Sequence, residues 1–440
     1  MKIFRLFFFY ILINVLHGKK GFGPGEQDWG YVTVRPGAHI FWWLFYTTAN
    51  DTASFEEKPF LIWLQGGPGV SGTGYGNFEE FGPLDTDLEL RNHTWVKNYN
   101  VLIIDNPVGT GFSYVDSYSA FVSNNQQITK DLMTFIHSFF NQHDKFQEIP
   151  TYIIAESYGG KMTVEFAYSW YKEQASGSIK SNFKGIGLID SFISSNDMYR
   201  SMGPYLYNLG MIDDVYLEKI SEAAEKFVNA SSVNDWPNAN SHGAEIHRLI
   251  DECTSGVDLY NVLKRVEPGH ESWKNSQHTL IDVFNLKFSY SKKLERFMKL
   301  VKEELNLESD WGDQEVYVSQ NLDLDSRIPV VDFVEKLLNE TNIQVYVING
   351  QLDLIINTRG VVDWIKNLNW VNKNDWRISP MKSLLVDNII EGYSKTSGNL
   401  TFYSVLRSGH MVMSRTNRIV HVCLVRNSWD TKLKKSLILS

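Results

Sequence analysis

The sequence predicts an α/β protein with a mostly parallel central sheet, helices on both faces and an inserted helical cap. Two short and almost wholly apolar runs, 59–64 and 100–104, are typical of strands buried on both faces of a sheet. Between the predicted strands, residues 128–140 repeat apolar side chains at helical spacing, which indicates an amphipathic helix packed against the sheet. Strands that alternate with helices in this way favour a parallel sheet.

The other elements follow in chain order. Further strands are expected at 31–34, 38–46, 152–154, 185–189, 343–348 and 400–405. From 204 to 324 the pattern becomes helical, polar and irregular, and we interpret this stretch as the inserted cap. The length of 440 residues suits a long α/β enzyme that folds as one unit.

The motif Ala155-Glu156-Ser157-Tyr158-Gly159-Gly160 directly follows the strand predicted at 152–154 and directly precedes a helix-like stretch. A serine on a sharp strand-to-helix turn is the nucleophile geometry of the α/β-hydrolase fold. The crowded turn requires small neighbours, and Ala155 and Gly159 supply them, although Ala155 stands where glycine is usual. We therefore expect an α/β-hydrolase fold. The carboxyl group of Glu156 beside the serine suits an enzyme that grips the free carboxyl end of a substrate.

A serine nucleophile needs a histidine base and an acid that orients the base, in the chain order serine, acid, histidine. Asp353 comes shortly after the strand at 343–348, and His410 lies in a loop after the strand at 400–405. A lone aspartate in a turn is usually a cap, and a lone histidine is usually solvated or a satisfied core residue. The order and the positions after strands nevertheless favour a catalytic triad of Ser157, Asp353 and His410.

A glycine-rich loop, Gln65-Gly66-Gly67-Pro68-Gly69, follows the strand at 59–64. On its own, such a loop is usually a tight turn. In an α/β-hydrolase order, a backbone N–H from this loop and the N–H after the nucleophile form the oxyanion hole. We assign Gly67 and Tyr158 to it.

Residues 1–18 are interpreted as a secretory signal peptide, because basic residues precede the apolar run 6–16. The run is too short to span a bilayer, and the alternative is an uncleaved anchor. No later stretch is apolar enough, so no membrane anchor is expected after signal cleavage. Surface glycosylation is predicted at the five Asn-X-Ser/Thr sites, Asn50, Asn92, Asn229, Asn339 and Asn399.

Composition limits the cofactors and partners. The net charge of −9 argues against nucleic acid as a partner. The two cysteines, Cys253 and Cys423, either pair or are free, and sequence does not decide between these states. None of the 11 histidines lies in an HExxH or zinc-type pattern, so we expect no metal and no cofactor.

Longer motifs carry a family resemblance between residues 29 and 412. They are Phe41-Trp42-Trp43-Leu44-Phe45-Tyr46, Trp63-Leu64-Gln65-Gly66-Gly67-Pro68-Gly69, Asn77-Phe78-Glu79-Glu80-Phe81-Gly82-Pro83, Asp105-Asn106-Pro107-Val108-Gly109-Thr110-Gly111-Phe112-Ser113-Tyr114, Glu156-Ser157-Tyr158-Gly159-Gly160, Asn349-Gly350-Gln351-Leu352-Asp353 and Gly409-His410-Met411-Val412. The chain resembles the serine carboxypeptidase family and, within it, the retinoid-inducible type. The resemblance implies a secreted or lysosomal exopeptidase that removes single residues from peptide or protein C-termini, best at acidic pH.

The resemblance also implies that Gln65, Glu80 and Glu156 hold the terminal carboxylate of the substrate. Two buried carboxyl groups that face a substrate carboxylate cannot all be ionised, so shared protons are required. We therefore expect substrate binding to weaken as pH rises. Gln65 is one methylene longer than the asparagine of the wider family, which shifts where the substrate carboxylate sits.

The end of the sequence departs from the family pattern. Residues 413–417 replace an expected proline and acidic turn, and the tail 413–440 is basic. We thus divide the chain into a signal peptide (1–18), a hydrolase core in two parts (19–203 and 325–412), the cap (204–324) and an atypical tail (413–440). Because of the tail, one alternative is a catalytically weak or inactive secreted glycoprotein that binds peptides. Another is an acyltransferase or esterase on the same scaffold, although Glu80 and Glu156 favour a carboxylate-ended peptide over a neutral ester.

Overall fold

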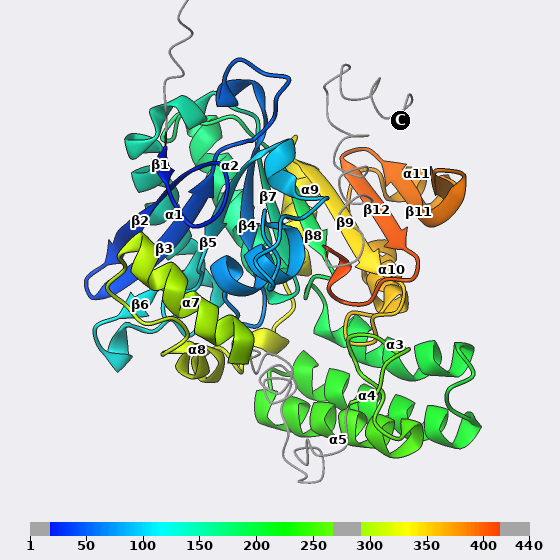
Figure 1. The fold of residues 1–440 in the computed structure, drawn as a ribbon. Coiled ribbons are helices and arrows are strands. Elements are labelled where there is room, and N and C mark those ends of the chain that lie inside the picture. The colour runs from blue at the N-terminus through cyan, green and yellow to red at the C-terminus, as the bar shows by residue number, and fades with distance from the viewer. Residues whose placement is uncertain (1–17, 267–291, 414–440) are drawn as a thin grey trace, which may run out of the picture.

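The computed structural model describes residues 18–266 and 292–413, which are built around one mixed β-sheet (Figure 1). Beyond Gly18 and Met413, the predicted signal peptide and tail lie outside the described residues, as does Cys423. The strands lie in the order β1-β2-β3-β5-β4-β7-β8-β9-β12-β11-β10, with β6 paired to β3. The strands are β1 (Lys19–Lys20), β2 (Glu26–Arg35), β3 (Ala38–Phe45), β4 (Phe60–Leu64), β5 (Asn100–Ile104), β6 (Tyr114–Val115), β7 (Thr151–Glu156), β8 (Phe183–Ile189), β9 (Gln344–Gly350), β10 (Lys382–Val386), β11 (Ile389–Ser397) and β12 (Leu400–Val405).

The six central strands, from β5 to β12 in the sheet order, all pair in parallel. Antiparallel strands flank this centre on both sides. Every residue of β4 and β5 is buried, which explains why both were readable in the sequence as short apolar runs. The predicted parallel centre of the sheet is therefore confirmed.

Helices cover both faces of the sheet. The helices are α1 (Asn125–Gln142), α2 (Tyr158–Ser176), α3 (Ser195–Asn208), α4 (Asp214–Ser232), α5 (Trp236–Thr254), α7 (Lys292–Leu305), α8 (Glu315–Asn321), α9 (Val331–Glu340), α10 (Thr358–Asn367), α11 (Lys373–Ile378) and the π-helical η2 (Gly72–Phe81). Side chains of successive strand residues point to opposite faces of the sheet and pack in two separate hydrophobic cores. In β3, for example, Trp42 packs in one core and Trp43 in the other. The first core includes α1, α2, α9 and α10, and the second includes η2 and α7.

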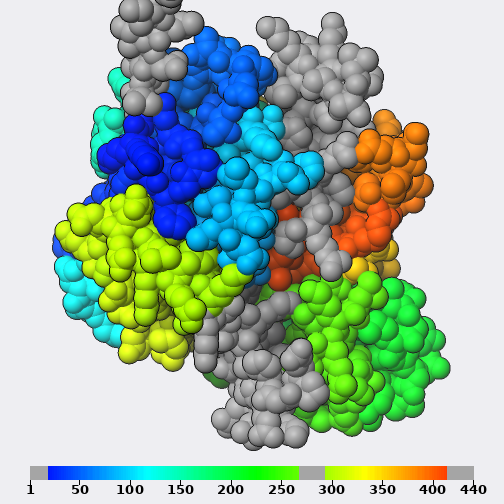
Figure 2. Space-filling view, in the orientation of Figure 1, coloured from blue at the N-terminus to red at the C-terminus, as the bar shows by residue number. Residues whose placement is uncertain are grey.

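The stretch interpreted as one cap, 204–324, occupies two places in the structure. Helices α3, α4 and α5 pack on one another and form a helical lobe, residues 195–254, that stands apart from the sheet (Figure 1). The predicted boundary at Pro204 falls inside α3. Helix α7 instead packs on the sheet through Phe297, Met298 and Val301 in the second core. In Figure 2 the yellow-green surface of α7 and α8 and the green surface of the lobe are separate parts of the same face.

The segment between residues 195 and 325, which contains the lobe as well as α7 and α8, begins and ends at one place, which we call the neck (residues 193–195 and 325–330). The Ser195 hydroxyl donates to the carbonyl of Arg327 at 2.6 Å, and the N–H of Val330 donates to the carbonyl of Ile193 at 2.9 Å. The buried ammonium of Lys161 on α2 donates to the carbonyl of Asp325 at 2.6 Å. Both ends of the excursion are thereby attached to each other and to the helix that follows Ser157.

Candidate active site

Sheet topology gathers the predicted site at one edge of the sheet. The last residue of β7, Glu156, pairs with Ile189 of β8, which pairs with Ile348 of β9, and Ile348 pairs with Tyr403 of β12. Loops that follow parallel strands therefore emerge side by side. Ser157, Asp353 and His410 follow β7, β9 and β12 respectively.

Ser157 has a strained backbone, with φ 57° and ψ −125°. A non-glycine residue in this region persists only where the surroundings hold it, as at the nucleophile of α/β-hydrolases. Here the N–H of Ser157 donates to the carbonyl of Ile189 at 3.0 Å, and its own carbonyl accepts from Gly160 and Phe192, also at 3.0 Å. The residue is 3% exposed. These bonds hold the serine at the top of β7, directly before α2.

The glycine-rich loop after β4 lies directly against the serine. A Cβ atom on Gly66 would stand 2.5 Å from the Cβ of Ser157 and 3.0 Å from the nitrogen of Tyr158, so only glycine fits. The next residue, Gly67, has φ +110°, a conformation that glycine adopts without strain. The two residues predicted for the oxyanion hole, Gly67 and Tyr158, thus flank this contact.

The predicted acid and base form a buried hydrogen bond. Nδ1 of His410 lies 2.7 Å from Oδ2 of Asp353, and both side chains are at most 1% exposed. Since Nδ1 faces a carboxylate, it carries the hydrogen and leaves Nε2 as the acceptor. Within the described part of the chain, Nε2 of His410 and Oγ of Ser157 are both buried and have no hydrogen-bond partner, and no bond joins them. In free enzymes such catalytic bonds are often long and tighten when substrate binds.

The loop that carries His410 is held by two other segments. The N–H of His410 donates to the carbonyl of Tyr260 at 2.8 Å, and the N–H of Leu352 donates to the carbonyl of Ser408 at 2.7 Å. The ring of Tyr260 meets the imidazole edge to face, with centroids 4.7 Å apart. A Cβ on Gly350 would stand 2.2 Å from the carbonyl oxygen of Gly409, so this close approach also requires glycine. The contacts that hold the loop of His410 thus come from residue 260 and from residues 350–353.

Beside the nucleophile, Gln65 joins Glu80 and Glu156 into one buried group, which we call the carboxyl pair with its bridging amide. The side-chain nitrogen of Gln65 donates to Glu80 and to Glu156, at 3.1 Å in each case. Its oxygen accepts from the indole of Trp63 at 2.7 Å, which orients the amide. All three members are at most 2% exposed. The three residues predicted to hold a carboxylate therefore lie together, and one of them, Glu156, directly precedes Ser157 in the chain.

Burial keeps protons on this pair. Desolvation raises the pKa of Glu80 to about 7, and the hydrogen bond with Glu156 and the one from Gln65 limit the rise. Desolvation, followed by the charge of Glu80, raises the pKa of Glu156 well above its ordinary value. At acidic pH the pair is therefore uncharged and can donate hydrogen bonds to an anion.

Two residues of this edge were missed by the sequence interpretation. Asp190 directly follows β8 with φ 39°, and its carboxyl group contacts that of Asp353. The signal for Asp190 was available, since an acidic residue directly follows the strand predicted at 185–189. Tyr260 lies in an irregular stretch, and no local pattern pointed to it.

The five predicted glycosylation sites differ in accessibility. The exposed ones are Asn50, Asn92, Asn229 and Asn339. Asn399 is half-buried, and its side-chain nitrogen donates to the carbonyl of Ile343 at 3.0 Å. The side-chain nitrogen of Asn339 likewise donates, to the carbonyl of Asn369 at 2.9 Å, so the amides of both Asn339 and Asn399 are engaged with the protein.

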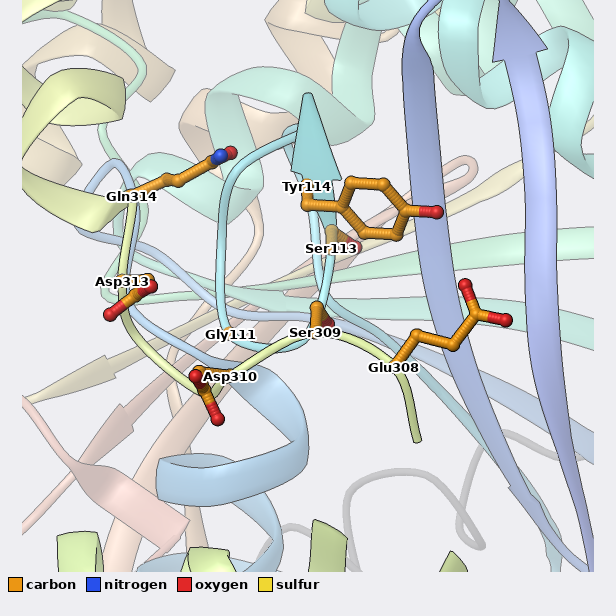
Figure 3. A pocket seen from close by; sticks show the side chains of 8 residues that line it. All are labelled: Gly111, Ser113, Tyr114, Glu308, Ser309, Asp310, Asp313 and Gln314. Atoms are coloured by element: carbon orange, nitrogen blue, oxygen red, sulfur yellow. The ribbon is translucent and has the colours of Figure 1, made fainter. Parts of the chain in front are cut away.

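A hollow of about 260 Å³ lies away from the triad, between the loop that leads into β6 and the segment before α8 (Figure 3). It is lined by Gly111, Ser113, Tyr114, Glu308, Ser309, Asp310, Asp313 and Gln314. Several of its polar groups already bind the protein: the Ser309 hydroxyl donates to Phe112, and Gln314 bonds both backbone groups of Val115. We interpret this hollow as part of the interface through which residues 308–314 pack against the core.

Among residues 18–266 and 292–413, no group of three or more His, Cys, Asp or Glu side chains is arranged to hold a metal ion. In the same residues, no helix is both long enough and apolar enough to cross a membrane.

Similarities to known proteins agree with this geometry. The family model "serine carboxypeptidase" matches residues 19–422. The chain is 39% identical to human retinoid-inducible serine carboxypeptidase, covering 89% of this chain and 88% of that protein, and 38% identical to the mouse protein with the same coverage. It is 32% identical to serine carboxypeptidase-like 51 of Arabidopsis thaliana, covering 90% of each chain. The structure resembles that of Kex1, a prohormone-processing carboxypeptidase of Saccharomyces cerevisiae, with a TM-score of 0.71, 23% identity and coverage of 91% of this chain and 90% of that one.

Proposed function

Because this chain belongs to the serine carboxypeptidase family, we propose that it releases single residues from the C-termini of peptides or proteins through an acyl-enzyme. In this proposal His410 takes the proton of the Ser157 hydroxyl while the oxygen attacks the last peptide carbonyl. Asp353 stabilises the imidazolium that forms. The N–H groups of Gly67 and Tyr158 receive the developing oxyanion. His410 then gives its proton to the departing amino group, and water releases the acyl chain by the same route.

The carboxyl pair with its bridging amide is the observation that supports an exopeptidase over an endopeptidase or esterase. Glu80 and Glu156 are buried and adjacent to the nucleophile, where an ordinary ester offers no group for them to bind. A free C-terminal carboxylate, in contrast, can accept hydrogen bonds from protonated carboxyl groups and from an amide. The pair therefore selects the last peptide bond of a chain.

The same pair supports a preference for acidic pH. Below the raised pKa values, Glu80 and Glu156 are protonated and attract the substrate carboxylate. Above them, the pair becomes negative and repels the carboxylate. Acidic compartments of the secretory pathway, such as the lysosome, or an acidic secreted fluid provide this condition, and the predicted signal peptide and glycosylation sites fit such a location.

One assay tests the proposal. The purified protein is incubated at acidic pH with an N-blocked dipeptide, with its C-terminal amide and with a simple ester. We expect release of the last residue from the free acid only, and labelling of Ser157 by a fluorophosphonate. No turnover and no labelling would favour the inactive peptide-binding glycoprotein. Comparable turnover of the simple ester would favour the esterase or acyltransferase.

A further inference from the structure

A second buried carboxyl contact lies behind the triad and has no role in the steps above. Asp190, at the end of β8, is 1% exposed and its carboxyl group contacts that of Asp353. Its backbone is held in place, since the N–H of Asp190 donates to the carbonyl of Ile348 at 2.8 Å. A non-glycine residue at φ 39° is strained, which indicates that its position is over-determined by its neighbours.

The two oxygens of Asp190 have different surroundings. Oδ1 accepts from the N–H of Gly350 at 2.9 Å and from the side-chain nitrogen of Asn349. Oδ2 is buried and receives no N–H or O–H from any residue within 18–266 and 292–413. Oδ1 is thus occupied by donors, and Oδ2 is the oxygen left to share a proton with Asp353.

Two carboxylates in contact inside a protein cannot both be ionised. Asp353 is the acceptor of the two, because Nδ1 of His410, the group that becomes an imidazolium, donates to it, as does the N–H of Ile356 at 3.1 Å. We propose that Asp190 is a positioning residue of the triad, which carries a proton on Oδ2 and donates it to the carboxylate of Asp353. Together they form a buried chain from Asp190 through Asp353 to His410. The inference rests on the proposed role of the triad.

The electrostatic surroundings agree with this assignment. Burial, followed by the charge of Asp353, raises the pKa of Asp190 well above its ordinary value. Among the described residues, the titratable groups that act on the two aspartates include Glu156, Tyr205 and Tyr260, and burial raises the pKa of each. At acidic pH these three side chains are neutral. The donated proton disperses the charge of the Asp353 carboxylate and orients it towards His410.

The test is the pKa of His410, read from the imidazole resonances of ¹³C-histidine-labelled protein. This readout does not need turnover, and His410→Gln identifies the resonance. The acidic limb of kcat/KM supplies a second reading wherever the enzyme is active. Failure of turnover would count against the proposed function, whereas the titration of His410 decides the role of Asp190.

Asp190→Asn keeps an acceptor for Gly350 and Asn349 and a donor for Asp353, so we expect the pKa of His410 to stay within about 0.3 units of the wild type and kcat within a few-fold. Asp190→Ala removes the donor, concentrates the charge on Asp353, and should raise the pKa of His410 by about one unit and lower kcat about tenfold. Asp131→Asn, which breaks the 2.9 Å ion pair between buried Asp131 and half-buried Arg35, is the matched control and should leave the His410 pKa unchanged.

A fall of about one unit in the His410 pKa in Asp190→Asn would show that Asp190 is charged, and would overturn the proposal. So would Asp190→Ala with lower stability but an unchanged His410 pKa and kcat, since that result describes a structural role alone. Where Asp190→Ala does not fold, Asp190→Asn decides.

Discussion

Replacing Glu80 with glutamine should remove the pH dependence of substrate binding. Glutamine keeps the shape of the protonated acid, so its oxygen still accepts from Gln65 while its amide donates to Glu156. In the wild type the pair loses its first proton near the Glu80 value of about 7. A new carboxylate about 4 Å from the substrate carboxylate costs about 4 kcal/mol at an effective dielectric constant of about 20, enough to prevent binding.

If only the protonated pair binds substrate, the apparent KM rises tenfold for each pH unit above 7. Between pH 6 and pH 8 we therefore expect the KM of an N-blocked dipeptide to increase about tenfold in the wild type and less than twofold in Glu80→Gln. Steady-state kinetics over pH 5 to 8 measure this, and the substrate carboxylate is ionised throughout. Glu89→Gln, the same substitution at an exposed position, is the matched control and should behave as the wild type. A tenfold rise that persists in Glu80→Gln, or a flat wild-type profile, would refute the reasoning.

Three further outcomes are expected. Asp353→Asn should lower kcat about 10⁴-fold with little change in KM, because the wrong tautomer of His410 is held, and fluorophosphonate labelling should slow in parallel. Gly66→Ala should abolish turnover and lower the melting temperature, since the added Cβ would meet Ser157 at 2.5 Å; an active, stable variant would contradict the close contact. Urea unfolding should show a protein that loses stability as pH rises, because the folded state holds a proton on Glu80 between its ordinary pKa of 4.5 and its raised pKa of about 7. That stability is fully present below about 4.5 and is lost through about 7, by up to about 3 kcal/mol, and Glu80→Gln should flatten the slope.

The parallel centre of the fold was readable because its strands are buried on both faces. The strand at 100–104 and the strand at 400–405 have the same bounds in the sequence interpretation and in the structure. The antiparallel hairpin 382–397 was not predicted, because its side chains are mostly exposed or half-buried and give no apolar run. The strands of this hairpin are stabilised by the pairing of β11 with β12. The sequence of the hairpin alone does not reveal that pairing.

For a related reason, the local sequence pattern did not show that the segment 204–324 is divided between the lobe and the sheet. The amphipathic residues of α7 show that one side is apolar, but not whether that side meets the lobe or the sheet. At the site, Ser157, Asp353 and His410 were predicted to act together because each follows a strand in a fixed order. The contact of Asp190 with Asp353 depends on β8 lying between β7 and β9, a property of strand order.

The neck has a consequence for how relatives of this protein can diverge. Because Ser195 and Arg327 are hydrogen-bonded, the two ends of the excursion between residues 195 and 327, which contains the lobe, are adjacent. A helical segment of different length grafted between such points has its ends close together, and the entropy of closing the loop grows only slowly with its length. The excursion can therefore be remodelled by insertion or recombination while the sheet edge is kept. The excursion also contains Tyr260, whose carbonyl binds the N–H of His410. A successful graft between the ends of the excursion must accordingly preserve the stretch around Tyr260, which links divergence of the excursion to the hydrogen bond that supports His410.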